Sequence, residues 1–159
     1  MKTINWKVLI LNLILPLAAG GIASLLTSTS MQQYQNLYKP PLAPPGYLFP
    51  IVWTILFLLM GIAAYFVTIS EAPNKKYALT LYGIQLVANV IWSIIFFNFN
   101  AYLVAFTWLL LLWFLIFLTW QEFRSISSTA GKLLVPYLAW VTFAGYLNLA
   151  IAINDILYG

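Results

Sequence analysis

Five long apolar runs, separated by short polar stretches, dominate the chain. They cover residues 8–26, 48–69, 77–97, 101–120 and 133–153, and none of them contains a charged side chain. A helix needs about 20 apolar residues to cross a bilayer, and each run is long enough. The pattern predicts an all-α integral membrane protein: one domain, residues 1–159, built as a bundle of five transmembrane helices.

The first run allows an alternative interpretation as a cleaved signal peptide, because Lys2 and Lys7 precede it and small residues follow it. However, the run is longer than the apolar region of a usual signal peptide, and Asn12 and Pro16 interrupt it. We therefore expect an uncleaved first span.

The connection between the first two runs, residues 27–47, contains two pairs of adjacent prolines. Because proline fixes φ and has no N–H, residues 39–46 are predicted to be extended and stiff rather than helical. Pro50 is expected in the first turn of the next helix, where the missing N–H costs least. We expect residues 27–47 to form a lid over a ligand cavity at the membrane surface. The paired prolines are Pro40, Pro41, Pro44 and Pro45.

The composition excludes most familiar chemistry. The chain has no cysteine and no histidine, so disulfides, thiol nucleophiles, Ser-His-Asp triads and most zinc, haem-ligand and iron–sulfur sites are ruled out. Only 6% of the residues are charged, against about 25% in soluble domains. The three acidic residues lie at or near the ends of apolar runs, which argues against a pair of catalytic carboxylates. We expect no metal site.

The formal net charge of +4 reflects membrane topology rather than nucleic-acid binding, because the basic residues are scattered between the apolar runs. With five spans, one side of the membrane holds six of the seven basic residues, and Lys39 alone lies on the other. The positive-inside rule places the N-terminus in the cytoplasm and the lid and C-terminus outside. The six are Lys2, Lys7, Lys75, Lys76, Arg124 and Lys132.

Three spans each carry a tryptophan on a stripe with polar, small or aromatic neighbours. Such stripes favour a cavity that encloses a flat aromatic ligand, with amide side chains on its polar edge. The alternative is that the amides only join helices by hydrogen bonds. The residues are Trp53 and Phe57; Gln85, Asn89 and Trp92; and Trp140, Ala144 and Asn148. A fourth stripe, Asn12, Pro16, Gly20 and Ser24, is interpreted as close helix packing.

The run at 101–120 is apolar on all sides, so it is expected to face lipid or a second copy of the chain. Aromatic residues near span ends are interpreted as anchors at the membrane interface. These are Trp6, Tyr47, Tyr77, Tyr102 and Trp120.

Three segments carry a family resemblance: KPPLAPPGYLFPIVWTILFLLMG, LYGIQLVANVIWSIIFF and LLVPYLAWVTFAGYLNLAIAIND. In these the chain resembles the translocator protein / tryptophan-rich sensory protein (TspO/MBR) family, as a bacterial member, over nearly its whole length. The resemblance implies a five-helix bundle, commonly a homodimer, that binds porphyrins such as protoporphyrin IX. It also implies binding of synthetic isoquinoline carboxamide and benzodiazepine ligands.

The family's ligand site lies under the first loop. Carried onto this chain, the resemblance places it at Tyr34, Pro44, Trp53, Phe57, Asn89, Trp92, Trp140 and Ala144. Some members bind cholesterol through a pattern with a basic residue after a tyrosine in the fifth span. No Lys or Arg follows Tyr146 here, so we do not expect high-affinity sterol binding.

Three functions compete at this point. The first is binding of tetrapyrroles for sensing or regulation, with the porphyrin as ligand and no further cofactor. The second is light- and oxygen-dependent degradation of a bound porphyrin, in which Trp53 and Trp140 donate electrons to the excited ligand. The third is a small-molecule transporter, although neither inverted repeats nor broken helices are evident in the sequence.

Overall fold

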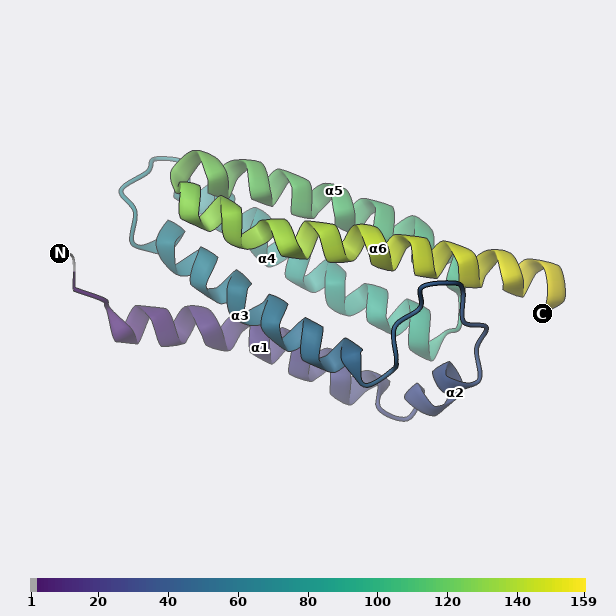
Figure 1. Ribbon diagram of the computed structural model, residues 1–159. Helices are drawn as coiled ribbons and strands as arrows, with labels where there is room; N and C mark the ends of the chain where they lie inside the picture. The colour runs from purple at the N-terminus through teal and green to yellow at the C-terminus, as the bar shows by residue number, and fades with distance from the viewer. Residues whose placement is uncertain (1–2) are drawn as a thin grey trace.

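A computed structural model describes residues 3–159, and this part of the chain contains helices and no strand. Five long helices lie side by side in one bundle (Figure 1). The elements are α1 (Trp6–Thr27), α2 (Met31–Gln35), α3 (Leu48–Thr68), α4 (Lys75–Ser93), the π-helical turn η1 (Ile94–Asn98), α5 (Tyr102–Ile126) and α6 (Ser128–Tyr158). Each of the five long helices, counting α4 and η1 as one, is long and apolar enough to cross a membrane. The predicted all-α, five-span fold is confirmed.

The α5–α6 junction differs from the polar connection expected at residues 121–132. Both helices continue into that stretch, and only Ser127 separates them. The Ser127 side chain caps α6 by accepting a hydrogen bond from the backbone N–H of Ala130 at 3.3 Å. Gly131 makes the tight turn possible, because a Cβ there would lie 2.7 Å from Arg124 Cβ. The sequence is polar here because the helices leave the bilayer, not because they end.

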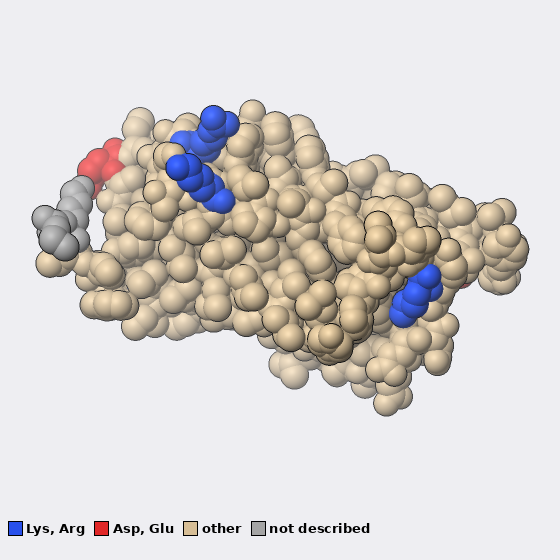
Figure 2. All heavy atoms as spheres, viewed as in Figure 1, with Lys and Arg blue, Asp and Glu red and all other residues tan. Residues whose placement is uncertain are grey.

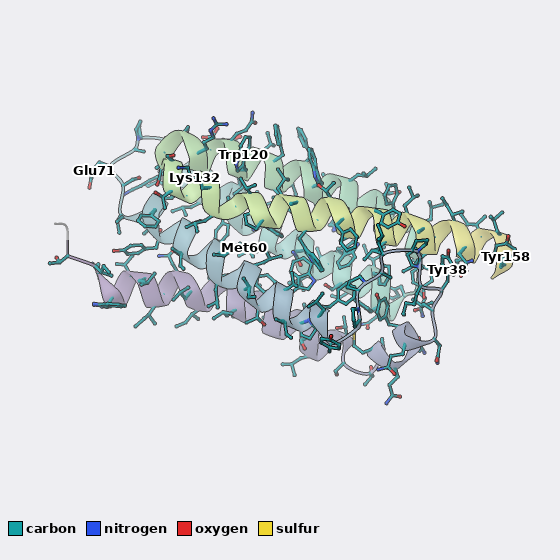
Figure 3. All side chains as sticks on the ribbon, in the orientation of Figure 1. Tyr38, Met60, Glu71, Trp120, Lys132 and Tyr158 are labelled. Atoms are coloured by element: carbon teal, nitrogen blue, oxygen red, sulfur yellow. The ribbon has the colours of Figure 1, made fainter. Side chains whose placement is uncertain are left out.

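Helix α6 is longer than the bilayer core requires. Its 31 residues span about 46 Å at 1.5 Å per residue, against a hydrocarbon core of about 30 Å. Its C-terminal turns extend past the neighbouring helices (Figure 1). Tyr38 of the lid and Tyr158 of α6 lie at this end of the bundle, and Glu71 and Lys132 lie at the other (Figure 3).

Helices α1 and α3 pack closely through glycine. A Cβ on Gly20 of α1 would lie 2.5 Å from the Phe57 ring, and a Cβ on Gly61 of α3 would lie 2.9 Å from the Asn12 carbonyl oxygen. The Thr68 hydroxyl donates to Asn12 Oδ1 at 3.2 Å across the same interface. Small residues let helices approach in a membrane, and here they bring α1 against Phe57.

Helix α5 was expected to face lipid or another copy on all sides, and this expectation is wrong for one of its faces. That face is buried against α4 and α6, whereas Leu103, Val104 and Leu110 are exposed. Trp113 donates from its indole N–H to Thr142 Oγ1 on α6 at 2.8 Å. Tyr102 is buried rather than interfacial, and its hydroxyl donates to Asn100 Oδ1. The buried face comprises Tyr102, Ala105, Leu109, Leu112, Ile116, Thr119 and Phe123.

Charge is confined to the two ends of the bundle. Figure 2 shows basic side chains near both ends of the visible face and an uncharged surface between them. Large apolar side chains on that middle zone are exposed, among them Ile14 on α1, Ile55 on α3 and Phe114 on α5. An exposed apolar band between charged ends is the surface that a lipid bilayer covers. The chain is therefore a multi-pass membrane protein.

Candidate functional site: a cavity beneath the lid

A cavity of about 610 Å³ lies among α1, α3, α4, η1 and α6, and its end is closed by α2 and Gly46 of the lid and by Phe49 in the first turn of α3. This volume is within the range of small-molecule sites, roughly 300–1,000 Å³. The structure brings eight of the ten sequence-predicted site residues to its lining. They are Tyr34, Trp53, Phe57, Asn89, Trp92, Trp140, Ala144 and Asn148.

The other two predicted residues, Gln85 and Pro44, do not line the cavity. Gln85 is buried one helical turn from Asn89, where its Nε2 lies 4.0 Å from Met60 Sδ. Pro44 is half-buried within the lid, and Gly46 and Phe49 form the lining in its place. Both corrections have the same cause. The cavity contacts only part of the α4 stripe and only part of the proline-rich loop, so one predicted residue of each lies outside it.

Three tryptophans form aromatic walls, each paired with a phenylalanine. Trp53 stacks on Phe57 with ring centroids 5.5 Å apart and an interplanar angle of 29°. Trp92 lies against Phe96 at 5.4 Å. Trp140 meets Phe49 edge-on at 5.8 Å. Stacked and edge-to-face contacts of this kind stabilise the positions of the aromatic walls.

A buried hydrogen-bond chain holds one side of the cavity. Asn89 Nδ2 donates to the Tyr137 hydroxyl at 2.8 Å, and that hydroxyl donates to Gln85 Oε1 at 2.6 Å. Within residues 3–159, Asn89 Oδ1 accepts no hydrogen bond, so this oxygen can accept one from a ligand. Sequence reasoning missed Tyr137. The signal was available, because Tyr137 lies one helical turn from Val141 and two turns from Ala144 on the buried face of α6.

A second chain uses both polar atoms of Asn148. Trp92 Nε1 donates to Asn148 Oδ1 at 3.1 Å, and Asn148 Nδ2 donates to the Tyr102 carbonyl at 2.8 Å. Of the two interpretations given above for the amides, helix joining therefore accounts for Asn148. The same bond fixes the plane of the Trp92 ring against the cavity.

Several lining residues were not predicted as site residues. Gly20, Gly21 and Ser24 on α1 line the cavity, so the small-residue stripe also makes room for a ligand. Phe96 and Phe97 both reach the cavity, although neighbours on an α-helix point about 100° apart. They belong to η1, whose π-helical turn contains one extra residue. A π-turn has no clear sequence signature, so this feature required the structure.

The lid, residues 27–47, is only partly the stiff extended segment that the prolines predicted for residues 39–46. It begins with the short helix α2 and contains a turn at Leu42, whose φ of 68° is left-handed. Residues 39–46 are free of helix, as expected. The Tyr146 hydroxyl on α6 donates to the Pro41 carbonyl at 2.8 Å and joins the lid to the bundle.

Tyr34 is the residue through which the lid closes the cavity. Its ring lies 5.9 Å from Phe49 and 5.6 Å from Phe97, and Lys39 Nζ lies 3.9 Å from the ring centroid on a cation–π contact. Burial raises the pKa of the Tyr34 phenol and lowers the pKa of the Lys39 ammonium. Burial in the closed lid thus favours the neutral form of both groups.

The chemistry of the lining is suited to binding. Among residues 3–159, no three Cys, His, Asp or Glu side chains lie close enough to hold a metal ion. The polar lining residues carry amides and hydroxyls, among them Asn89, Thr54, Ser24 and Gln35. The cavity can enclose a flat apolar ring system and hydrogen-bond its edge, but it contains no conventional acid, base or nucleophile.

Comparison with known proteins gives a consistent picture. Residues 12–153 match the model of the TspO/MBR family. The chain is 42% identical over 138 residues to a tryptophan-rich protein TspO of Chlorobaculum tepidum, covering 85% of this chain and 87% of the relative. It is 36% identical to a tryptophan-rich sensory protein of Cereibacter sphaeroides, covering 72% of each chain. It is also 36% identical to the translocator protein of Ovis aries, covering 72% of this chain and 70% of that one.

Proposed function

The chain belongs to the TspO/MBR family, and we propose that it binds protoporphyrin IX-like tetrapyrroles in the cavity beneath the lid, for tetrapyrrole sensing or regulation. Isoquinoline carboxamide-type compounds, which are also flat and aromatic, would occupy the same cavity. One observation carries the proposal: Trp53, Trp92 and Trp140, which come from three different helices, all line a single cavity of about 610 Å³. A macrocycle offers the large flat surface that three aromatic walls can contact.

The lid supports the same ligand class. Lys39 lies over Tyr34 at the membrane surface, where a carboxylate on the ligand edge would meet a positive charge. The macrocycle would lie deeper, among the tryptophans, in contact with Asn89 Oδ1. A ligand with a flat apolar ring and a carboxylate at its edge would therefore fit a cavity with an aromatic interior and a cationic rim.

Binding can be tested directly on purified protein in lipid nanodiscs. Protoporphyrin IX should quench tryptophan fluorescence and shift its own Soret band with saturable, one-site behaviour. Trp53→Ala and Trp140→Ala should weaken binding, and Leu110→Ala on the exposed face of α5 should not. Equal affinity in all three variants would contradict the assignment of the cavity.

A second candidate function is light- and oxygen-dependent degradation of the bound porphyrin. It is favoured by the contact between Trp53 and Tyr137, whose ring centroids lie 6.2 Å apart. Trp53, packed against Tyr137, would donate one electron to the photo-excited ligand, dioxygen would add to the ligand radical anion, and the electron would return to the Trp53 radical cation, so that the net change is addition of O2 to the macrocycle. Trp140, on another wall of the cavity, is the other candidate electron donor. Transport is a third candidate, which no contact in the cavity specifically favours.

Membrane orientation and assembly belong to the same proposal. The N-terminal end, the α3–α4 connection and the α5–α6 turn lie at one end of the bundle, and the lid and C-terminus at the other (Figure 1). Lys7, Lys75, Lys76, Arg124 and Lys132 therefore share an end, which we place in the cytoplasm; Lys2 lies outside the described residues. A homodimer would use an exposed apolar helix face, such as that of α5.

A further inference from the structure

A second hollow lies on the lipid-facing side of the bundle, in the groove between α3 and α6. It has a volume of about 460 Å³ and is lined only by apolar side chains and the indole of Trp140. Ile55 of α3 and Ala139 of α6 are exposed on its rim. The residues are Val52, Ile55, Leu56, Leu59, Pro136, Ala139, Trp140 and Phe143.

Among residues 3–159, Trp140 is the one that lines both this groove and the cavity beneath the lid. Its ring has an aromatic neighbour on each side. Phe49, 5.8 Å away, lines the cavity, and Phe143, 5.6 Å away, lines the groove. At this point the wall between the bilayer and the cavity is one side chain thick.

The indole of Trp140 lacks the hydrogen bond that holds Trp92 and Trp113 in place. Trp92 donates its N–H to Asn148, and Trp113 donates to Thr142. Trp140 Nε1 is buried, and within the described part of the chain it has no hydrogen-bond partner. A buried donor without a partner costs about 1–3 kcal/mol, so the observed rotamer is not a hydrogen-bonded minimum. Turning the ring aside breaks no hydrogen bond.

The route through the lid is different. Opening it separates the Tyr146 hydroxyl from the Pro41 carbonyl and the Tyr34 ring from Phe97 of η1. It also separates Ser30 from Asn98, a 2.8 Å hydrogen bond that ties the start of the lid to η1. A hydrophobic ligand already dissolved in the bilayer would have to leave the membrane to use this route.

We propose that the α3–α6 groove is a lateral portal, through which a flat hydrophobic ligand passes directly between the bilayer and the cavity, and that the Trp140 side chain is its gate. This inference rests on the proposed function of the cavity. The occupant of the groove is the same porphyrin-class ligand, in transit.

The test fills the groove without touching the cavity. Ala139→Phe adds a ring in the groove, and Ala139 does not line the cavity. Ala18→Phe is the matched control, since Ala18 is exposed on α1 and lines neither space. Protoporphyrin IX association is followed by stopped flow with protein in nanodiscs, and dissociation by dilution into excess porphyrin-free vesicles.

Because a gate lies on the path in both directions, Ala139→Phe should slow association and dissociation by the same factor and leave Kd unchanged. We expect about tenfold, equivalent to about 1.4 kcal/mol in the barrier. Ala18→Phe should change neither rate. As a further arm, Tyr146→Phe, which loosens the lid, should leave both rates near wild type.

Other outcomes separate the two proposals. Rates unchanged by Ala139→Phe, or both accelerated by Tyr146→Phe, would assign access to the lid and overturn the portal while leaving binding intact. An altered Kd in Ala139→Phe would show that the groove and the cavity are not separate spaces, and this result would also overturn the portal. If the wild-type protein shows no saturable protoporphyrin IX binding, the proposed function fails and the portal fails with it.

Discussion

The indole N–H of Trp92 on α4 donates a hydrogen bond to Asn148 Oδ1 on α6, at 3.1 Å, inside the apolar core of the bundle. This one bond orients a tryptophan whose face lines the ligand cavity, and it joins two helices. Asn148 also donates a hydrogen bond from its Nδ2 to the Tyr102 carbonyl at the start of α5. Stability and cavity geometry therefore depend on the same amide.

We predict that the Trp92–Asn148 bond is worth a measurable coupling energy. Trp92→Phe and Asn148→Ala should each destabilise the protein, and a double-mutant cycle on unfolding in detergent should give a coupling of about 0.6–1.7 kcal/mol. The range is modest because unfolded helices in a detergent or bilayer find other partners. Strictly additive single effects would mean that the bond contributes nothing.

Gln85 and Asn89 lie one turn apart on α4 and should respond differently to substitution. Gln85→Met keeps the length of the side chain and removes an acceptor outside the cavity, so it should lower stability and change protoporphyrin IX affinity little. Asn89→Leu removes the amide that lines the cavity and should weaken affinity by about tenfold, or about 1.4 kcal/mol. Equilibrium titration on both variants measures this. A larger loss of affinity in Gln85→Met than in Asn89→Leu would mean that Gln85, rather than Asn89, contacts the ligand.

Lid stability should fall at alkaline pH through Tyr34. Burial raises the folded pKa of this phenol above its ordinary value of 10.0, so the stability contributed by the neutral form is complete below pH 10 and is lost as the pH rises through the folded pKa. Lys39, whose pKa is lowered by burial, acts in the opposite direction as it loses its proton.

The pH prediction is measured as the unfolding midpoint of wild type and of Tyr34→Phe between about pH 8 and about pH 12, since tyrosine and lysine titrate in this range. The other tyrosines and Lys39 are common to both proteins, so the difference isolates Tyr34. Wild type should lose more stability than the variant above pH 10. Parallel curves would mean that closure does not bury the phenol.

Photochemistry distinguishes binding alone from degradation. Trp53→Phe and Trp140→Phe keep an aromatic ring but remove the more easily oxidised indole, so affinity should fall by at most about tenfold. If the protein degrades its ligand through these residues, loss of the Soret band under illumination should collapse in both. Trp120→Phe is the control, because Trp120 lies outside the cavity, at the end of the bundle opposite Tyr38 (Figure 3). Equal loss in all three variants and in free porphyrin would leave a binding protein.

Residue pattern by itself determined the fold class and most of the cavity. Runs of about 20 apolar residues have one stable form in lipid, a helix that satisfies its own backbone, so five runs could be identified as five helices from sequence. The helical period then placed Trp53 with Phe57, and Asn89 with Trp92, on shared faces. Because polar residues within a span face protein or a cavity rather than lipid, the sequence predicted that these faces point inward, and it left a shared cavity and simple helix joining as the two interpretations.

Tertiary structure decided which polar atoms are already paired and which space is open. Sequence shows that Gln85, Asn89 and Asn148 are amides on inward stripes. Only the structure shows that Gln85 lies outside the cavity, bonded to Tyr137. It also shows that both polar atoms of Asn148 are already hydrogen-bonded, one of them to the Tyr102 carbonyl. Only the packing of α3 against α6 shows that Trp140 lies between a cavity and a groove while its N–H stays free. The physical reason is that helical periodicity fixes the direction of a side chain relative to its own helix, whereas hydrogen bonds and cavities depend on how neighbouring helices are placed and rotated.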